Sequence, residues 1–576
     1  MSVCDFIIEL NRLRKSSSES IDSTNKFDEF KEYIHVERTA ERDLKDILKK
    51  VNATGKKTLF MLCGSAGDGK SHLMSYLKNS EPEKLIENYQ VYNDATEVSS
   101  QCKKPNETLN ELLDRFSDEK CDESGQNLIL AINLGVLSNF VESEYAKTRF
   151  NRLKTYVEKC NILTSMVNDN DYDASSPFQH ISFADYNLFS LGEEGVVSDY
   201  IERLLDKIFA ENETNIFFKA YKKKSVECPL TSTCPIKNNF EMFMDKNNRK
   251  YISQLLVKGI VKDKEIITTR EILNYVYDVL VSPEFSFDKM CMVLSNPLTM
   301  LKEYVKNITP TLMFDNADVT PLMNQLQKYD PVLKRTEEAD AFAVHYNVSA
   351  EIEDQIRTYL KGSSYESVLA NNKLIGQINS DKVLKLHLFK ALIRINEIMN
   401  YNENDEVYIS FLKDLYYYNA GHSMGLASLY NKVQKAVIQW CGSESDANVC
   451  LDDSIMGYSV YEDLDFKEYL DNMPEKVDDG QLQRFVPNIV IEFTNKHTSE
   501  IVRLTIDYSL YELISKLNEG YIQTADDRNN HADFIIFVEK MLYAGSLGEN
   551  ILIVSDRGEK AVVKKTGFGY EFKVVK

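Results

Sequence analysis

The chain has 576 residues, 43% hydrophobic and 27% charged, a composition typical of a folded protein with several domains. Its formal net charge of −21 argues against a broad surface that binds nucleic acid unaided, because phosphate contacts need clustered Lys and Arg side chains. Ten cysteines are too sparse for a disulfide scaffold, Asp5 and Glu9 exclude a signal peptide, and no apolar run is long enough to span a membrane. We therefore expect a cytoplasmic protein that does not contact a membrane.

The first part of the chain, residues 1–55, is expected to be a helical segment. Apolar residues recur at helical spacing near its start, and a serine-rich break follows them. Residues 27–51 then show the charged, amphipathic pattern of one or two further helices.

Residues 58–74, KTLFMLCGSAGDGKSHL, contain the pattern around which the chain is organised. A short apolar run predicts a buried strand at Leu59–Leu62, and the residues after the glycines predict a helix. Between them, residues 64–71 match G-x-x-x-x-G-K-[ST], whose backbone N–H groups and following helix N-terminus surround a polyphosphate. Lys70 would reach the β- and γ-phosphates, and the Ser71 hydroxyl would bind Mg²⁺. The residues predicted to hold the nucleotide are Gly64, Ser65, Ala66, Gly67, Asp68, Gly69, Lys70, Ser71 and His72.

Strands that alternate with helices are expected after this loop. Apolar runs predict further strands at 89–97, 127–137 and 180–186, and a crossover helix at 109–116. This alternation is typical of a doubly wound α/β sheet. The sequence therefore predicts a P-loop NTPase core with a mostly parallel sheet over residues 56–215.

Beyond this core the strand pattern fades. Residues 216–345 are expected to form a helical lid and connecting region, and residues 346–445 a helical domain. From Arg484 onward, short alternating runs and two amphipathic stretches predict strands mixed with helices. We therefore expect a small α+β domain at 446–576.

Hydrolysis requires a carboxylate that supports Mg²⁺ and a group that orients the attacking water. The end of the second strand supplies Asp94 for Mg²⁺ and Glu97 for water, although both could instead cap the next helix. Asn133 ends the third strand, where it could contact the γ-phosphate or satisfy local backbone groups. An acid is usual at that strand's end, so Asn133 raises the alternative of slow turnover.

A lid residue could complete the site. Arg270 lies in the first turn of a predicted helix capped by Thr268 or Thr269, where a cation can stabilise charge on the γ-phosphate. A surface arginine is the simpler interpretation. Asp185 and Asp315 are reserve acids for which a structural role is favoured. The candidate catalytic residues are thus Lys70, Asp94, Glu97, Asn133 and Arg270, and the candidate metal ligands are Ser71 and Asp94.

Two weaker groupings remain. Cys228 and Cys234 cannot complete a tetrahedral zinc site alone, so metal binding there is left open. A C-terminal cluster could cradle a phosphate backbone, but a charged face with aromatic core residues is the simpler interpretation. This cluster comprises Arg557, Lys560, Lys564, Lys565, Lys573 and Lys576, with Phe568, Tyr570 and Phe572 between them. Asp556 with Glu571 loosely echoes a nuclease metal site, but nuclease activity is not expected.

Several longer stretches, taken in order, resemble the DptF family of ATPase components in bacterial DNA phosphorothioation-dependent restriction. They are FDEFKEYIHVERTAERDLKDIL, CGSAGDGKSHLMSYL, VYNDATE, ILAINLGVL, TTREILNYVYDVL, LMFDNAD, YDPVLKR and DYSLYELISKLNEGYIQTADDR. The resemblance runs nearly end to end and implies that Gly64–Ser71 is an ATP site. It also implies partners like DptG and DptH, and restriction of DNA that lacks the sulfur modification.

We therefore expect a Mg²⁺-dependent ATPase that acts as a switch or motor subunit in such a complex. Its partners would supply much of the DNA contact, which agrees with the acidic net charge. Bound γ-phosphate would hold the lid against the sheet, and hydrolysis would release it. The alternative is a nucleotide-binding scaffold with little turnover that assembles the restriction complex.

Overall fold

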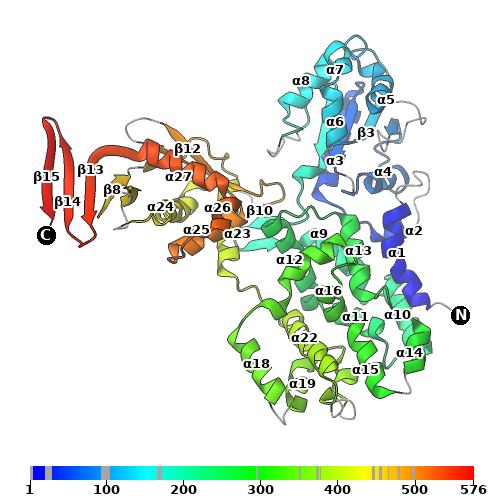
Figure 1. The fold of residues 1–576 in the computed structure, drawn as a ribbon. Coiled ribbons are helices and arrows are strands. Elements are labelled where there is room, and N and C mark those ends of the chain that lie inside the picture. The colour runs from blue at the N-terminus through cyan, green and yellow to red at the C-terminus, as the bar shows by residue number, and fades with distance from the viewer. Residues whose placement is uncertain are drawn as a thin grey trace. The chain divides into compact units, whose positions relative to one another are not determined.

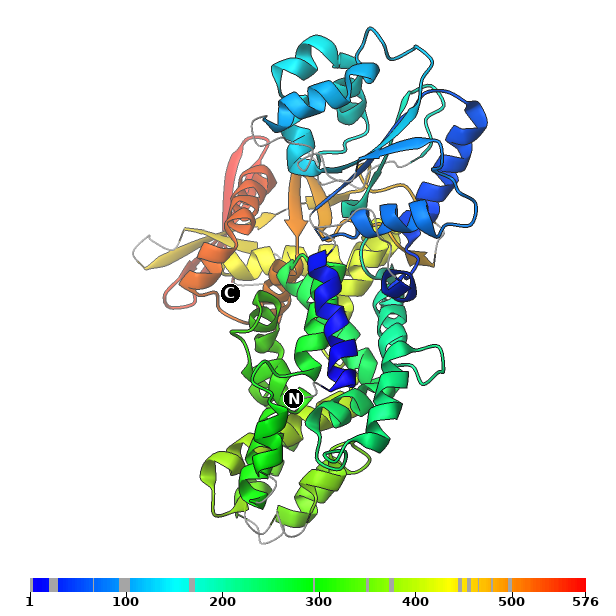
Figure 2. The ribbon, with the colours of Figure 1, turned by 90° about the vertical axis from the view of Figure 1, so that its right-hand side faces the viewer.

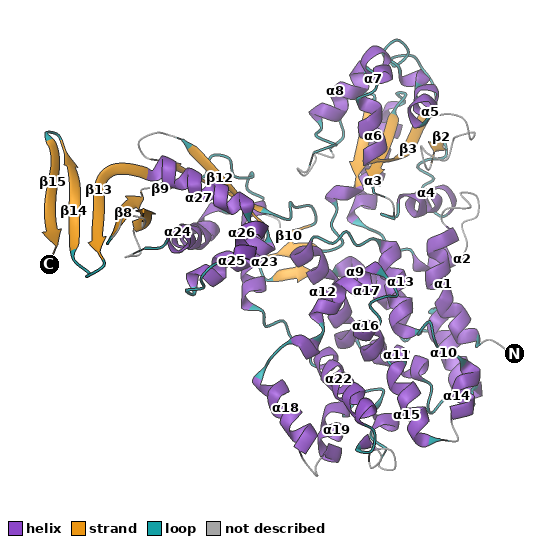
Figure 3. Ribbon diagram, in the orientation of Figure 1, coloured by secondary structure: helices purple, strands orange, loops and turns teal. Residues whose placement is uncertain are grey.

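The computed structural model describes residues 4–19, 29–65, 67–92, 104–164, 171–293, 296–348, 352–371, 375, 378–443, 448–452, 457–464, 466–477, 480–495 and 500–575. Over these ranges the chain is a mixed α/β protein that divides into two compact units (Figures 1 and 3). The first unit comprises residues 1–189, 198–260 and 264–403, and the second comprises residues 190–197, 261–263 and 404–576.

A parallel sheet forms the centre of one part of the first unit. Its strands are β1 (Leu59–Gly64), β2 (Tyr89–Tyr92), β3 (Asn127–Asn133) and β4 (Phe178–Ser182), in the spatial order β2-β3-β1-β4. Gly64 pairs with Asn133, and Cys63 pairs with Ser182, so these strand ends lie level with one another. Because all four strands run the same way, their carboxyl ends form one edge of the sheet, where the glycine-rich loop begins.

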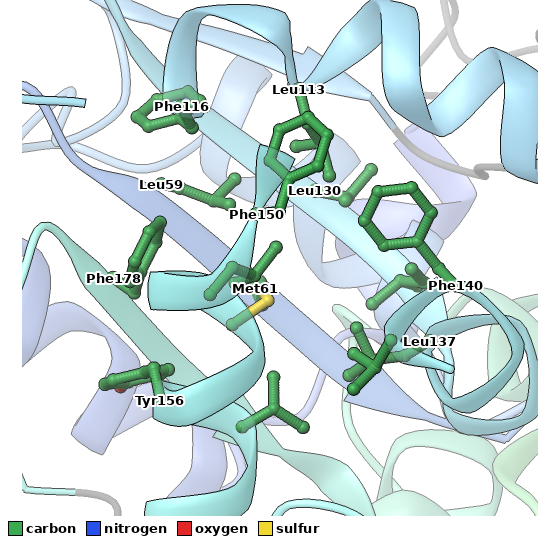
Figure 4. Close-up of a cluster of buried hydrophobic side chains, with 14 of the residues drawn as sticks. Leu59, Met61, Leu113, Phe116, Leu130, Leu137, Phe140, Phe150, Tyr156 and Phe178 are labelled. Atoms are coloured by element: carbon green, nitrogen blue, oxygen red, sulfur yellow. The ribbon is translucent and has the colours of Figure 1, made fainter. Parts of the chain in front are cut away.

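Helices cover both faces of this sheet. Alternate side chains of a strand point to opposite faces, so Leu59 and Met61 join a buried cluster with α5 (Pro105–Leu112), α6 (Leu134–Val141) and α8 (Asn151–Lys159) (Figure 4). Phe60 and Leu62 join a second buried cluster with α3 (Thr39–Thr54) and α4 (Lys70–Asn79) on the other face. Burial on both faces explains why β1 is continuously apolar, and it confirms the prediction of a parallel α/β sheet.

The helices of the first unit surround this sheet and continue into a helical region. They are α1 (Asp5–Glu19), α2 (Glu29–Ile34), α3 (Thr39–Thr54), α4 (Lys70–Asn79), α5 (Pro105–Leu112), α6 (Leu134–Val141), α7 (Glu144–Arg149), α8 (Asn151–Lys159), α9 (Asp199–Phe209), α10 (Ile216–Glu227), α11 (Pro235–Met244), α12 (Lys246–Asp263), α13 (Thr269–Leu280), α14 (Phe287–Val293), α15 (Pro297–Lys306), α16 (Thr309–Asp315), α17 (Pro321–Leu326), α18 (Glu337–Val348), α19 (Ile352–Leu360), α20 (Glu366–Leu369) and α22 (Lys382–Met399). None of the helices described is both long and apolar enough to cross a membrane.

The second unit is built from antiparallel strands and helices. Its elements are β5 (Ser190–Gly192), β6 (Gly195–Val197), α23 (Glu406–Asn419), α24 (Ala427–Cys441), β7 (Asn448–Asp452), β8 (Tyr458–Leu464), β9 (Phe466–Tyr469), β10 (Gln481–Leu482), β11 (Ile489–Asn495), β12 (Ile501–Ile506), α25 (Tyr508–Asn518), α26 (Ala525–Asn530), α27 (Ala532–Gly545), β13 (Ser546–Ser555), β14 (Lys560–Thr566) and β15 (Gly569–Val575). The strands form sheets in the orders β10-β5-β6, β12-β11-β9 and β15-β14-β13-β8-β7.

Some predicted boundaries were wrong. The strand predicted at 127–137 ends at Asn133, because that residue caps α6 and the chain turns helical at Leu134. The strand predicted at 180–186 spans Phe178–Ser182 instead. The strands predicted after Arg484 are confirmed. Strands β7 to β10, which precede it, were missed: charged residues interrupt the apolar pattern of β8 and β9, and β10 has only two residues.

The N-terminal helix α1 lies against α10 and α13 of the helical region (Figure 2). On α13, Asp278 is only 2% exposed, and Arg14 Nη1 of α1 lies 3.7 Å from its Oδ1. Burial raises the pKa of Asp278 to about 6, and Arg14 offsets part of this effect. The carboxyl group therefore keeps its proton in the folded chain at a pH where the unfolded chain has lost it.

Asp278→Asn is expected to stabilise the protein at pH 7. Between the ordinary pKa of 3.8 and the folded value of about 6, the folded state binds more protons, so stability falls as pH rises. Above this window the buried charge costs about 3 kcal/mol, which the neutral amide avoids. Urea unfolding should show the gain at pH 7.5 and its loss near pH 4, with exposed Asp288→Asn as the control. An equal gain at both values would contradict the assignment.

Candidate functional site

The loop between β1 and α4 lies at the carboxyl edge of the parallel sheet. Gly67 and Gly69 have φ angles of +90° and +92°, which residues with a side chain rarely adopt. Gly69 is the N-cap of α4 and has no side chain with which to cap that helix. The backbone N–H groups of the first turn of α4 lie at this end of the loop, where the helix dipole is positive. Ala66 lies outside the described residues.

A lysine and a carboxylate lie inside this loop. Lys70 Nζ donates a hydrogen bond to the Ser65 carbonyl oxygen at 2.5 Å, and the Ser65 N–H donates to Asp68 Oδ2 at 2.5 Å. Burial raises the pKa of Asp68, and the nearby Lys70 ammonium offsets part of the rise. Ser71, the second residue of α4, is half-buried beside them. The loop thus concentrates a cation, helix N–H groups and a hydroxyl at one end of α4.

Arg38, which sequence reasoning missed, joins the loop to other elements. Its Nη1 donates to the Asp68 carbonyl oxygen at 2.9 Å, and its Nη2 donates to the Tyr186 carbonyl oxygen at 3.2 Å. Its guanidinium also lies over the rings of Phe183 and Tyr200, 5.4 and 5.3 Å from their centroids. Arg38 is the N-cap of α3. No sequence pattern predicts its contacts, because its partners lie in distant segments, in the turn after β4 and in α9.

The start of α13 contacts the same loop. A Cβ added at Gly67 would lie 3.1 Å from Thr268 Oγ1. Thr268 caps α13, accepting from the Glu271 N–H, and the Glu271 carboxylate accepts from the Thr268 N–H. Arg270 is half-buried in the first turn of α13, as predicted, and Thr269 Oγ1 lies 2.9 Å from the Tyr200 hydroxyl. The structure thus brings the predicted lid helix to the loop through Thr268, whose contact the sequence did not indicate.

Other candidates at the sheet edge have mixed outcomes. Asn133 is exposed, and its Oδ1 accepts from the Gly135 N–H at 2.8 Å, so its oxygen performs the local capping that was the competing interpretation. Asp185 lies in the short turn after β4. Burial raises the pKa of the Cys63 thiol, and the negative charge of Asp185 also raises it. Asp94 and Glu97 lie outside the described residues.

The His72 side chain contacts His35. Its Nε2 lies 3.1 Å from His35 Nδ1, and the His35 ring stacks on Tyr76 with centroids 3.8 Å apart. His35 Nε2 in turn lies 3.2 Å from Glu41 Oε2. Burial lowers the pKa of His72 to about 4, so its imidazole is neutral at pH 7.

The remaining candidates do not form a second site among the described residues. Arg394 donates to both Asp315 and Asp330, which supports the structural role favoured for Asp315. Burial raises the pKa of Cys234 to about 11, so this thiol is protonated at pH 7. No group of three His, Cys, Asp or Glu side chains suited to a metal ion occurs within the described ranges.

The simpler interpretation of the C-terminal cluster, which placed its aromatic residues in a core, is wrong. Phe568, Tyr570 and Phe572 are strongly exposed rather than buried in a core. They lie on and beside β15, the outermost strand of its sheet, where no further strand covers them in the part of the chain that is described. Lys576 lies outside the described residues.

Comparison of the sequence with protein-family models gives no match, and comparison with curated proteins gives none. The function proposed next therefore depends on the geometry of the loop and its neighbours.

Proposed function

We propose that residues 64–71 bind ATP with Mg²⁺ and that the chain hydrolyses the nucleotide as a molecular switch. The observation that carries this proposal is the loop at the carboxyl edge of a parallel sheet, followed by a helix whose N-cap is Gly69. Backbone N–H groups and the partial positive charge of a helix N-terminus stabilise phosphate oxygens in such a place.

Each loop residue has a chemical role in this proposal. Lys70 exchanges its bond to the Ser65 carbonyl for the β- and γ-phosphates, and the Ser71 hydroxyl binds Mg²⁺. Asp94 follows β2, which β3 separates from β1. Asp94 would support Mg²⁺, and Glu97 would orient the attacking water.

The contact between the loop and α13 supports a switch. A nucleotide changes a conformational equilibrium only if it binds the two conformations with different affinity. Thr268 lies beside Gly67, and Arg270 follows it in the first turn of α13, so a γ-phosphate would alter the contacts of both residues. Arg270 would then stabilise the charge that develops during phosphoryl transfer.

We further propose that this ATPase serves bacterial restriction of DNA lacking phosphorothioate, together with DptG- and DptH-like partners. The resemblance in eight ordered stretches supports this role. The net charge of −21 favours DNA contact through partners rather than through this chain alone.

Calorimetry and phosphate-release assays with Glu97→Gln test the proposal, with and without partners and DNA. The amide cannot orient water as the carboxylate does, so turnover should fall while ATP affinity is retained. Exposed Glu87→Gln should leave both quantities unchanged. Absence of ATP binding to the folded chain, alone and with partners, would overturn the proposal.

A scaffold with little turnover is the second candidate. The capping bond of Asn133 favours it, because the strand beside β1 then offers an amide where hydrolytic sites usually hold an acid. Tight ATP binding without phosphate release in the assembled complex, and restriction that survives Glu97→Gln, would establish the scaffold. Rapid turnover in the complex would exclude it.

Gly67→Ala is expected to weaken ATP binding at least about 10-fold. The new methyl group meets Thr268 at 3.1 Å, and the φ of +90° strains any residue with a Cβ, so the loop must shift. Gly55→Ala is the matched control, because Gly55 also has a positive φ, +62°, but has nothing within 4 Å of the added atom. Calorimetric titration should show normal affinity for the control, and equal losses would show that general strain is the cause.

A further inference from the structure

The outermost strand of the five-stranded sheet, β15, is exposed along its whole length (Figure 1). Tyr570 is 72% exposed, and Phe572 and Val574 are each 63% exposed. Among the described strands β15 pairs only with β14, so its other edge carries a row of backbone N–H and C=O groups without a strand partner. Soluble proteins usually protect such an edge, because it readily pairs with another chain.

The hairpin register shows which residues of β15 face this edge. Thr566 pairs with Gly569 across a two-residue turn, and hydrogen-bonded pairs alternate with non-bonded pairs from there. Glu571 and Lys573 therefore bond to β14, opposite Lys564 and Val562. Tyr570, Phe572 and Val574 direct their backbone N–H and C=O groups outward.

We propose that β15 pairs in antiparallel fashion with β15 of a second copy of this chain, about a two-fold axis at Phe572. In that register Phe572 meets Phe572 of the second copy, and Tyr570 meets Val574, with their outward backbone groups hydrogen bonded. The same register places Glu571 directly opposite Lys573 of the second copy, twice in the dimer. The two sheets become one continuous sheet, and the apolar residues of both copies share one face.

Charge selects this register over its neighbours. If the two β15 strands slipped by one residue, residues whose backbone groups point outward would face residues whose groups already bond to β14. The hydrogen bonds between the two copies would then be lost. A slip by two residues retains the ladder, but it places Glu571 opposite Glu571 or Lys573 opposite Lys573 of the second copy. Like charges directly opposite each other are destabilising. The strand is thus self-complementary in one register, which identifies a second copy as its occupant.

Sedimentation velocity of the full chain tests the dimer. We expect a concentration-dependent dimer that Phe572→Pro abolishes, because proline removes an outward N–H and leaves the bonds between β14 and β15 in place. Phe572→Thr is the matched control, since it retains the N–H and should dimerise, though more weakly. A monomer at every soluble concentration would overturn the proposal, as would a dimer that Phe572→Pro does not affect.

Charge exchange tests the register. Lys573→Glu should raise the dimer Kd about 10-fold, because two attractive pairs become repulsive, and Glu571→Lys should do the same. Mixing the two variants restores Glu opposite Lys at both positions, so differently tagged copies should form a mixed dimer in preference to either self-dimer. Failure of the mixture to recover affinity would exclude this register.

Cysteine cross-linking tests the axis directly. Phe572→Cys should form a disulfide between copies on mild oxidation, because the Cα atoms of an antiparallel bonded pair lie about 5.5 Å apart. Tyr570→Cys should not cross-link to itself, since it faces Val574 of the second copy, but it should cross-link to Val574→Cys in a mixture. Mass spectrometry of the linked peptides separates these products from those of the native cysteines. Self-linking of Tyr570→Cys, or binding of an oligonucleotide to β15 in a chain that stays monomeric, would overturn the proposal.

Discussion

Lys70→Ala is expected to lower the rate of ATP hydrolysis by at least about 100-fold, and to weaken ATP binding as well. Lys70 is the cation inside the glycine-rich loop, where its Nζ already bonds the Ser65 carbonyl oxygen at 2.5 Å. Removing it leaves the β- and γ-phosphates without the charge that stabilises their transfer. Phosphate release measured under saturating ATP, together with calorimetric Kd values, separates the two effects.

The control for this substitution is Lys78→Ala, at the exposed C-terminal end of the same helix. It removes the same charge from α4 and should leave binding and hydrolysis unchanged. Unaltered hydrolysis in Lys70→Ala would mean that the loop does not hold the reacting phosphates. Unaltered melting temperatures of both variants would show that neither effect comes from unfolding.

Arg394→Met is expected to destabilise the first unit by about 3–5 kcal/mol. Arg394 on α22 is only 1% exposed, and its Nε and Nη2 donate to the two carboxylate oxygens of Asp330 at 3.0 and 2.6 Å. Its Nη2 also donates to Asp315 Oδ1 at 2.6 Å, and its guanidinium lies over the Phe314 ring. Without the arginine, a buried carboxylate loses its charged partner while the chain gains only apolar volume.

Urea unfolding measures this loss, and Arg357→Met on α19 is the control because Arg357 is exposed. The triple substitution of Arg394, Asp315 and Asp330 by apolar residues should recover part of the stability, since no unpaired charge remains. A change below about 1 kcal/mol in Arg394→Met would show that the ion pairs contribute no more than surface pairs do.

Sequence patterns located the glycine-rich loop, the strand before it and the helix after it, because these features are local. A strand buried on both faces must be apolar throughout, and a helix must start where the glycines end. The helix predicted after residue 266 was also located as α13, and Thr268 is its cap. The position of Thr268 against Gly67 was not foreseen, because the two residues are distant in the chain and nothing in either segment encodes their contact.

The aromatic residues near the C-terminus show the opposite case. Alternation predicted strands there correctly, yet it placed Phe572 in a core, although this side chain is 63% exposed. Alternating apolar and polar residues indicate that the two faces of a sheet differ. They do not indicate which face is covered by other parts of the chain. The sheet order, with β15 at an edge, decides that question.

By itself the sequence determined the phosphate-loop pattern, the apolar strands and the acidic balance of charge, since each depends on neighbouring residues or on composition. Only the tertiary structure decided that Arg38 and Thr268 contact the loop, that His72 points toward His35, and that Asp315 pairs with Arg394. The reason is physical, because these contacts form between segments that come together only when the sheet and its helices are packed.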